Sequence, residues 1–321
     1  MALLTTLTTV GSLQALAQTP ALAKIHFDSG DLTRAKEAID KTIEDPRHNT
    51  KPKTWYYRGL IYEKLAANAS ATQQPSTLGL LQQAHDAYRK ALTVDPDDKT
   101  VRQDTEKSLS DLHNLAMNFG VQCYQASNKR HALQAFVLAA AVKPTDLLAL
   151  SFASELALDL QEYPQYEQLA AQLTALPMAA YEAHNATREA AVHLLKQDVY
   201  GRLALYWSQQ RKNAAKAIET CKKGLAELPT DNTLHRILID LYLQNQMPAD
   251  ALASAKAMTR QRPADASTFF NLGVVHEKLQ QTDAAVEAYQ KAFQLDSNYI
   301  DALYNLGALY YNRAAEISKR L

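Results

Sequence analysis

The chain has 321 residues and a mass of 35.6 kDa, which gives room for two average domains without requiring a boundary between them. Its 34 basic and 34 acidic residues cancel, which argues against a nucleic-acid partner, because binding to phosphates depends on excess positive charge. No apolar run reaches the roughly 18 residues of a transmembrane segment, and two cysteines are too few for a disulfide scaffold.

The first 17 residues are apolar and rich in Thr, and no charge precedes Lys24. They end in Ala15-Leu16-Ala17, the small-x-small pattern of a signal-peptidase site, although the usual basic residues before the apolar stretch are missing. We therefore predict a signal peptide at 1–17 and a periplasmic or secreted protein. The alternative is the disordered N-terminus of a cytoplasmic protein.

From residue 19 onward the sequence repeats with a period of 34 residues. Leu272-Gly273 recurs as Leu306-Gly307, and Pro229 recurs as Pro263. Small residues recur in the same way at Ala217, Ala251 and Ala285. Earlier segments share the internal spacing: Trp55, Gly59, Tyr62, Ala84, Tyr88, Ala91 and Pro96, then Phe119, Gly120, Ala132, Phe136, Ala139 and Pro144.

This spacing predicts pairs of amphipathic helices, because apolar residues at i, i+3, i+4 and i+7 form one stripe on a helix. Glycine inside a helix costs about 1 kcal/mol relative to Ala, so Gly59, Gly120, Gly273 and Gly307 are expected where two helices approach closely. The predicted pairs are 19–46, 52–97, 113–146, 147–178, 198–231, 232–265 and 266–299, followed by a single helix at 300–321.

The order of aromatic, Leu-Gly, Tyr, Ala, aromatic, Ala and Pro over 34 residues resembles the tetratricopeptide repeat (TPR) family. The resemblance covers nearly all of the chain after residue 18. It implies an all-α fold in which helix-turn-helix repeats stack in a right-handed superhelix, an α-α solenoid, with 18–321 as a single array. A secreted array with YNLGALYYN near its end also resembles uncharacterised Bacteroidota proteins.

Three joints interrupt the period, near 66–80, 98–112 and 179–197. The stretch from Ala66 to Gly79 is small and polar and predicts an extended loop. The second joint is charged and free of Pro, which favours a longer helix, and the third is helical in its pattern. The pair at 147–178 lacks the repeat glycine and has Tyr166 in an Ala position.

The sequence shows no motif for catalysis, for a cofactor or for a metal. His276-Glu277 begins like a zinc-protease helix, but Gln280 stands where the second His belongs. We expect a packed ring at His276 and small apolar packing at Cys123 and Cys221. An enzyme would need groups that converge across the fold, and a pocket with His, Asp or Glu at the 147–197 irregularity would indicate one. We predict that the protein is not an enzyme.

The resemblance implies that the first helix of each pair lines a concave groove that binds a peptide or helix of a partner protein. Aromatic anchors supply apolar area and amides supply hydrogen bonds in such grooves. The positions that match are Tyr56, Met117, Asn118, Tyr124, Tyr206, Arg236, Phe270, Asn271, Lys278, Tyr304, Asn305 and Tyr311, and Arg202, Gln209 and Asp240 belong to the same face. The Asn residues at 118, 271 and 305 either form a ladder along a bound backbone or are simply common in the repeat.

The last predicted helix, 300–321, carries apolar residues on its far side, where repeat arrays usually present a polar cap. Three explanations stay open: a truncated chain, docking of a partner, or self-association. We predict a non-enzymatic scaffold for protein–protein interaction. The alternative is a structural subunit of a cell-envelope complex that docks through this helix or the convex face.

Overall fold

The computed structural model describes residues 19–69, 74–176 and 186–320. All regular secondary structure in these ranges is helical, which confirms the predicted all-α class. The helices belong to two compact units, Met1–Gln172 and Leu173–Leu321. The predicted signal peptide at 1–17 lies outside the described residues. No helix in the described ranges is long and apolar enough to cross a membrane.

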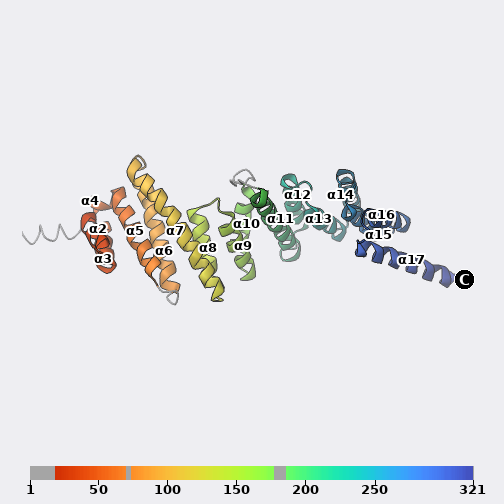
Figure 1. Ribbon diagram of the computed structural model, residues 1–321, viewed down its shortest axis with the longest axis horizontal. Coiled ribbons are helices and arrows are strands. Elements are labelled where there is room, and N and C mark those ends of the chain that lie inside the picture. The colour runs from red at the N-terminus through yellow and green to blue at the C-terminus, as the bar shows by residue number, and fades with distance from the viewer. Residues whose placement is uncertain (1–18, 70–73, 177–185, 321) are drawn as a thin grey trace, which may run out of the picture. The chain divides into compact units, whose positions relative to one another are not determined.

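The first unit is built from helix pairs that lie side by side in chain order (Figure 1). Its helices are α2 Pro20–Asp28, α3 Leu32–Glu44, α4 Pro46–Asn49, α5 Pro52–Asn68, α6 Gln74–Val94, α7 Lys99–Gln125, α8 Lys129–Val142, α9 Leu147–Asp159 and most of α10, Tyr163–Ala175. Each predicted pair in this unit corresponds to two of these helices. The four-residue helix α4 was not predicted.

The second unit repeats the arrangement, and each first helix packs on the second helix of its own pair and on the next pair. Its helices are α11 Ala186–Gln209, α12 Ala214–Glu227, α13 Asn232–Gln244, α14 Pro248–Gln261, α15 Ala266–Lys278, α16 Thr282–Leu295 and α17 Ile300–Arg320. The predicted phasing of the pairs is confirmed from residue 198 to the last helix.

Three of the four repeat glycines, Gly59, Gly120 and Gly273, occupy the close contacts predicted for them. The prediction is wrong for Gly307, because a Cβ atom built on it would meet nothing within 4 Å. A Cβ atom built on Gly273 would lie 2.5 Å from the Tyr289 ring, and one built on Gly120 would lie 2.7 Å from the Phe136 ring. Both distances are shorter than real Cβ contacts. In these two pairs, and in the pair of Gly59 and Tyr88, an aromatic ring of the second helix lies against the glycine of the first, which is why glycine is kept inside a helix there.

The turns inside the pairs share one backbone feature that the sequence did not reveal. Six of them contain a residue with positive φ in the described ranges, and only the first of these residues is a glycine. These residues are Gly30, Ser127, Gln161, Lys212, Gln246 and Gln280. The left-handed conformation reverses the chain between the two helices at the same repeat position every time.

At the first joint the structure departs from the predicted extended loop, and at the second it agrees with the predicted longer helix. The expected loop from Ala66 to Gly79 is largely helical, because α5 continues to Asn68 and α6 begins at Gln74. Thr77 and Leu81 are buried, so packing holds this part of α6 in place. The second joint lengthens α7, as predicted. The third joint lies partly outside the described residues, and its remainder forms the start of α11.

Candidate functional site

The structure opens a cleft between two first helices of the second unit, α11 and α13. The cleft has a volume of about 590 Å³. The lining residues of α11 recur at helical spacing, and so do those of α13, so each helix contributes one face to the cleft. The lining residues are Leu194, Gln197, Asp198, Gly201, Arg202, Leu205, Ser208 and Gln209 from α11, and Thr233, Arg236, Ile237, Asp240, Leu241 and Gln244 from α13.

The floor of the cleft is apolar and closely packed. Ile237 and Leu241 are buried, and a Cβ atom on Gly201 would lie 3.3 Å from Ile237 Cδ1. Glycine at position 201 thus lets α11 and α13 approach each other. Leu194 and Leu205 stand on the rim and remain 62% and 40% exposed. The cleft therefore offers exposed apolar area beside a rigid floor, as binding pockets do.

Charged groups of both signs line the same cleft. Arg202 Nε donates to Asp198 at 2.8 Å, so these two side chains neutralise each other. Arg236 is exposed and makes no hydrogen bond or ion pair with the described part of the chain. Asp240 is half-buried, and burial raises its pKa, although the positive charges of Arg236 and Lys278 act in the opposite direction. Arg236 and Asp240 are thus the charges left free to meet a ligand.

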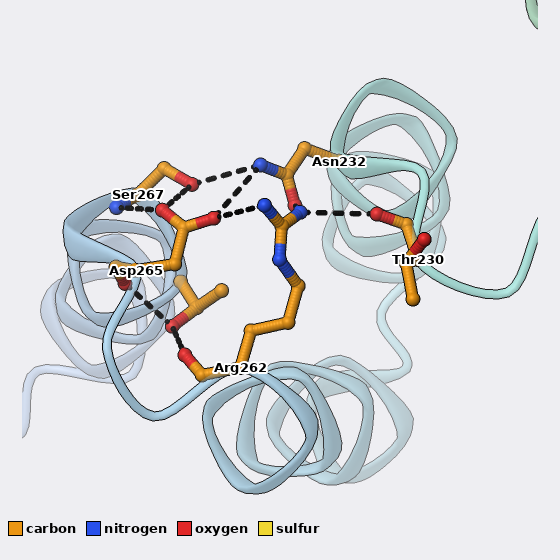
Figure 2. Close-up of polar contacts among 6 residues, drawn as sticks. Thr230, Asn232, Arg262, Asp265 and Ser267 are labelled. Carbon is orange, nitrogen blue, oxygen red and sulfur yellow. Dashed lines mark hydrogen bonds and ion pairs between the residues drawn. The ribbon is translucent and has the colours of Figure 1, made fainter. Parts of the chain in front are cut away.

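A polar network fixes α15 against the start of α13 (Figure 2). Arg262 Nη1 donates to the Thr230 carbonyl at 3.0 Å and to Asn232 Oδ1, while its Nη2 lies 2.6 Å from Asp265 Oδ2. Asp265 also caps α15 by accepting from the Ser267 amide at 2.9 Å. Because these groups are used within the protein, we interpret the network as structural.

The same capping arrangement recurs along the chain. Asp146 and Asp231 cap α9 and α13 by accepting the amides of Ala149 and Leu234. His113 Nε2 lies 2.8 Å from Oδ2 of Asp146, which stands 33 positions later in the chain. In the same way, Asn232 donates a hydrogen bond to Asp265, which also stands 33 positions later. A polar side chain on one first helix therefore reaches the capping aspartate of the next. Sequence reasoning missed this link, although the recurring Asp before each helix was a visible signal.

Further contacts lie on α11 near the end of the 147–197 irregularity, where a pocket with converging His, Asp or Glu would indicate an enzyme. Lys196 is buried, forms an ion pair with Glu227 and donates to the Leu176 carbonyl. Tyr200 also donates to Glu227. These contacts tie α11 to α12. The cleft lining contains no His, and the described residues form no group of three His, Cys, Asp or Glu that could hold a metal ion.

The predicted groove residues of the first unit have mixed surroundings. Tyr56 is half-buried, and its ring centroid lies 6.3 Å from that of Tyr88, so its ring belongs partly to the helix–helix contact. Met117 is half-buried, Asn118 is exposed, and Tyr124 is 56% exposed. No described cleft collects these four residues.

In the second unit, four of the predicted residues line the cleft: Arg202, Gln209, Arg236 and Asp240. Tyr206 is buried beside Trp207, so its ring is not available there. Phe270 packs between Tyr289 and Tyr299, and Asn305 donates to the Tyr289 hydroxyl at 3.2 Å. The remaining predicted residues are the buried Asn271 and the exposed Lys278, Tyr304 and Tyr311.

The packed histidine and the cysteines lie as predicted. His276 is buried, and its Nδ1 lies 2.7 Å from Gln281 Oε1. Cys123 and Cys221 are free and fully buried, and burial raises the pKa of Cys221 to about 12. All three side chains serve the packing of the repeats.

Comparison with known proteins identifies one repeat directly. Residues 278–313 match the TPR repeat family. No curated protein matches the sequence.

Several solved structures are similar to the chain at low identity. YrrB, described as a TPR protein with an unusual peptide-binding site, is 16% identical and covers 68% of this chain and 97% of its own, with a TM-score of 0.39. A tetratricopeptide repeat protein from Parabacteroides merdae ATCC 43184 is 17% identical over 90% and 96%, with a TM-score of 0.33. The P58(IPK) TPR domain is 12% identical over 94% and 98%, with a TM-score of 0.30.

These likenesses concern the fold alone. Similarity to one Parabacteroides structure at this identity does not test the predicted resemblance to Bacteroidota proteins, which stays a prediction. The helix pairs, their phasing and the TPR match agree on a helical repeat fold. On the surface of this fold, the cleft between α11 and α13 is the candidate binding site.

Proposed function

We propose that the protein is a non-enzymatic interaction scaffold that binds a segment of a partner protein in the cleft between α11 and α13. The cleft itself carries the proposal, because it combines exposed apolar rims with two uncommitted charges of opposite sign. Leu194 and Leu205 would bury an apolar side chain of the ligand. Arg236 would pair with an acidic group, and Asp240 with a basic one.

A selection from a library of displayed peptides on the full chain tests this proposal. Charge reversal at the cleft, Arg236→Glu, should weaken the selected peptides at least tenfold in fluorescence anisotropy, because it leaves two like charges beside each other and opposes the acidic group. Arg260→Glu is the matched control, since Arg260 is an exposed arginine on α14 outside the cleft. Equal affinities for both variants would refute the cleft as the binding site.

The exposed apolar face of α17 supports a second candidate, a subunit that docks into a cell-envelope complex through this helix. In that case a chain ending at residue 299 loses its partner, whereas Arg236→Glu keeps it. Loss of the partner in the cleft variant alone would exclude this candidate. Both variants need an unchanged circular dichroism melt to be interpreted.

We also propose that the protein is exported and cleaved after Ala17, with Gln18 as the first residue of the mature chain. The support is the sequence pattern alone. Mass spectrometry of the protein isolated from its source cells should find a chain that lacks 1–17. An intact Met1 in the isolated protein would contradict export through this signal.

A further inference from the structure

Helix α17 has one face packed on the preceding helix pair, α15 and α16, and one face open. On the inner side Ala302 and Leu309 are buried, and Leu306 packs against the cluster that contains Tyr289. On the outer side Ile300, Tyr304 and Tyr311 remain 76%, 75% and 76% exposed. Exposed aromatic and aliphatic side chains on one face of a helix indicate an interaction surface.

The open face has the spacing of a coiled-coil seam. Its residues alternate at intervals of four and three along the helix, which is the pattern of two helices packed along their length. We call this stripe the α17 seam: Ile300, Tyr304, Gly307, Tyr311, Ala314 and Ser318. A heptad period keeps such a stripe facing its partner over many turns.

Other repeats show that positions of this seam are normally covered. Gly59, Gly120 and Gly273 each lie under an aromatic ring of a following helix, but a Cβ atom on Gly307 would meet nothing within 4 Å. Phe270, which stands 34 residues before Tyr304, is half-buried against two tyrosines. Gly307 and Tyr304 therefore belong to a surface shaped for an aromatic-bearing helix.

We propose that the α17 seam binds the α17 seam of a second copy in an antiparallel pair. With Gly307 of one copy opposite Tyr311 of the other, each large side chain meets a small one. Tyr311 lies on the second copy's Gly307, Tyr304 meets Ala314, and Ile300 meets Ser318. A parallel pair would instead place Tyr on Tyr and leave Gly opposite Gly, which leaves voids between the helices.

The charges of the helix favour the same direction. Asp301 lies near the beginning of α17 and Lys319 near its end, so an antiparallel pair brings opposite charges together at both ends. A parallel pair would place Asp301 beside Asp301 and Lys319 beside Lys319, so that like charges would repel each other. Arg313 is already engaged, because its Nη1 lies 2.9 Å from Asp283. Size and charge thus select one register and one direction for a second copy.

Sedimentation equilibrium of the full chain tests the pairing. Mass should rise with concentration from 35.6 kDa toward twice that value. Tyr311→Glu puts an acidic group into each seam and should weaken association at least tenfold, while Asn312→Glu is the matched control because Asn312 is exposed beside the seam. A wild-type chain that stays monomeric at about 100 µM, or equal effects of both variants, would overturn the proposal.

Disulfide cross-linking tests the direction. Chains with Tyr304→Cys, mixed with chains with Ala314→Cys, should form a mixed disulfide under mild oxidation. Cross-linking of Tyr304→Cys chains mainly with each other would show a parallel pair and overturn the antiparallel register. The native Cys123 and Cys221 are fully buried, so they should contribute little cross-linking of their own. The inference is independent of the cleft, and Arg236→Glu should leave association unchanged.

Discussion

At the scale of single residues, a contact between a glycine and an aromatic ring sets how closely the two helices approach in three of the pairs. Tyr289 lies on Gly273 and donates from its hydroxyl to Glu277 at 2.8 Å, while Tyr88 lies on Gly59 and donates to Glu63 at 2.6 Å. The same ring is therefore held by packing at its face and by a carboxylate at its hydroxyl. A side chain on the glycine would displace both contacts.

We expect Gly273→Ala to lower the free energy of unfolding by about 1–3 kcal/mol, because its Cβ would overlap the Tyr289 ring. Gly79→Ala is the control, since a Cβ on Gly79 meets nothing within 4 Å and Ala is favoured over Gly in a helix by about 1 kcal/mol. Urea denaturation of both variants measures the difference. A stabilised Gly273→Ala would show that the ring can move away without loss.

Burial of a carboxyl group gives a pH dependence that can be measured. Burial raises the pKa of Glu63, the negative charge of Asp111 acts in the same direction, and the hydrogen bond from Tyr88 opposes both. The folded chain thus holds this proton more tightly than the unfolded one. The contribution of Glu63 to the free energy of unfolding falls as pH rises from the ordinary pKa of Glu through the raised value.

Glu63→Gln should therefore raise the melting temperature at pH 7 and remove this part of the fall with pH. Glutamine still accepts the hydrogen bond from Tyr88 and carries no charge to bury. Glu219→Gln serves as the control, because Glu219 is exposed and pairs only with Lys223 at the surface, where such pairs contribute little. Melting curves between pH 4 and 8 that coincide for Glu63→Gln and wild type would contradict the argument.

At the scale of helices and turns, the non-glycine residues with positive φ in five of the turns carry a steric cost. Gln161 has φ of 60° between α9 and α10, where a side chain is disfavoured. The repeat spacing places the turn, but five of the six turns use a residue other than glycine. The tertiary contacts of the two helices hold the strained conformation in place.

Gln161→Gly should stabilise the chain by up to about 1 kcal/mol, because glycine adopts positive φ without a steric cost. The same substitution at Gln134, an exposed position inside α8, should destabilise it by about 1 kcal/mol. Thermal melts of the two variants should therefore move in opposite directions. Destabilisation by both would mean that the turn gains nothing from glycine.

At the scale of the whole molecule, the helices form two units, and contacts within each run between neighbouring pairs. The stability of such a chain is close to a sum of terms for each repeat and each interface between neighbours. A local defect should then weaken its own surroundings and leave distant repeats unaffected.

Hydrogen exchange followed by mass spectrometry tests this locality. Gly59→Ala should speed exchange in α5 and α6, where the Tyr88 ring lies on Gly59, and leave α13 to α16 as in the wild type. Gly273→Ala should give the reverse pattern. Faster exchange throughout the chain in either variant would show that both units unfold as one.

Sequence reasoning reached the helix pairs, their phasing and the role of the repeat glycines, because these follow from spacing along one chain. It failed at Ala66–Gly79, where small polar residues favour a loop locally but Thr77 and Leu81 are buried in a helix. It also placed Tyr206 and Tyr304 at groove positions, but Tyr206 is buried and Tyr304 is exposed, and burial depends on neighbours that the repeat spacing does not specify.

The sequence by itself therefore determined which residues form helices and which stripe of each helix faces a neighbour, since both depend on local periodicity. Only the tertiary structure decided which exposed positions form a site. The cleft exists because α11 and α13 approach at Gly201 while Leu194, Leu205, Arg236 and Asp240 stay outside the packed floor. The α17 seam is open because no ring covers Gly307. Whether a side chain is exposed depends on the residues that lie next to it in space, and the spacing of residues along the chain does not specify them.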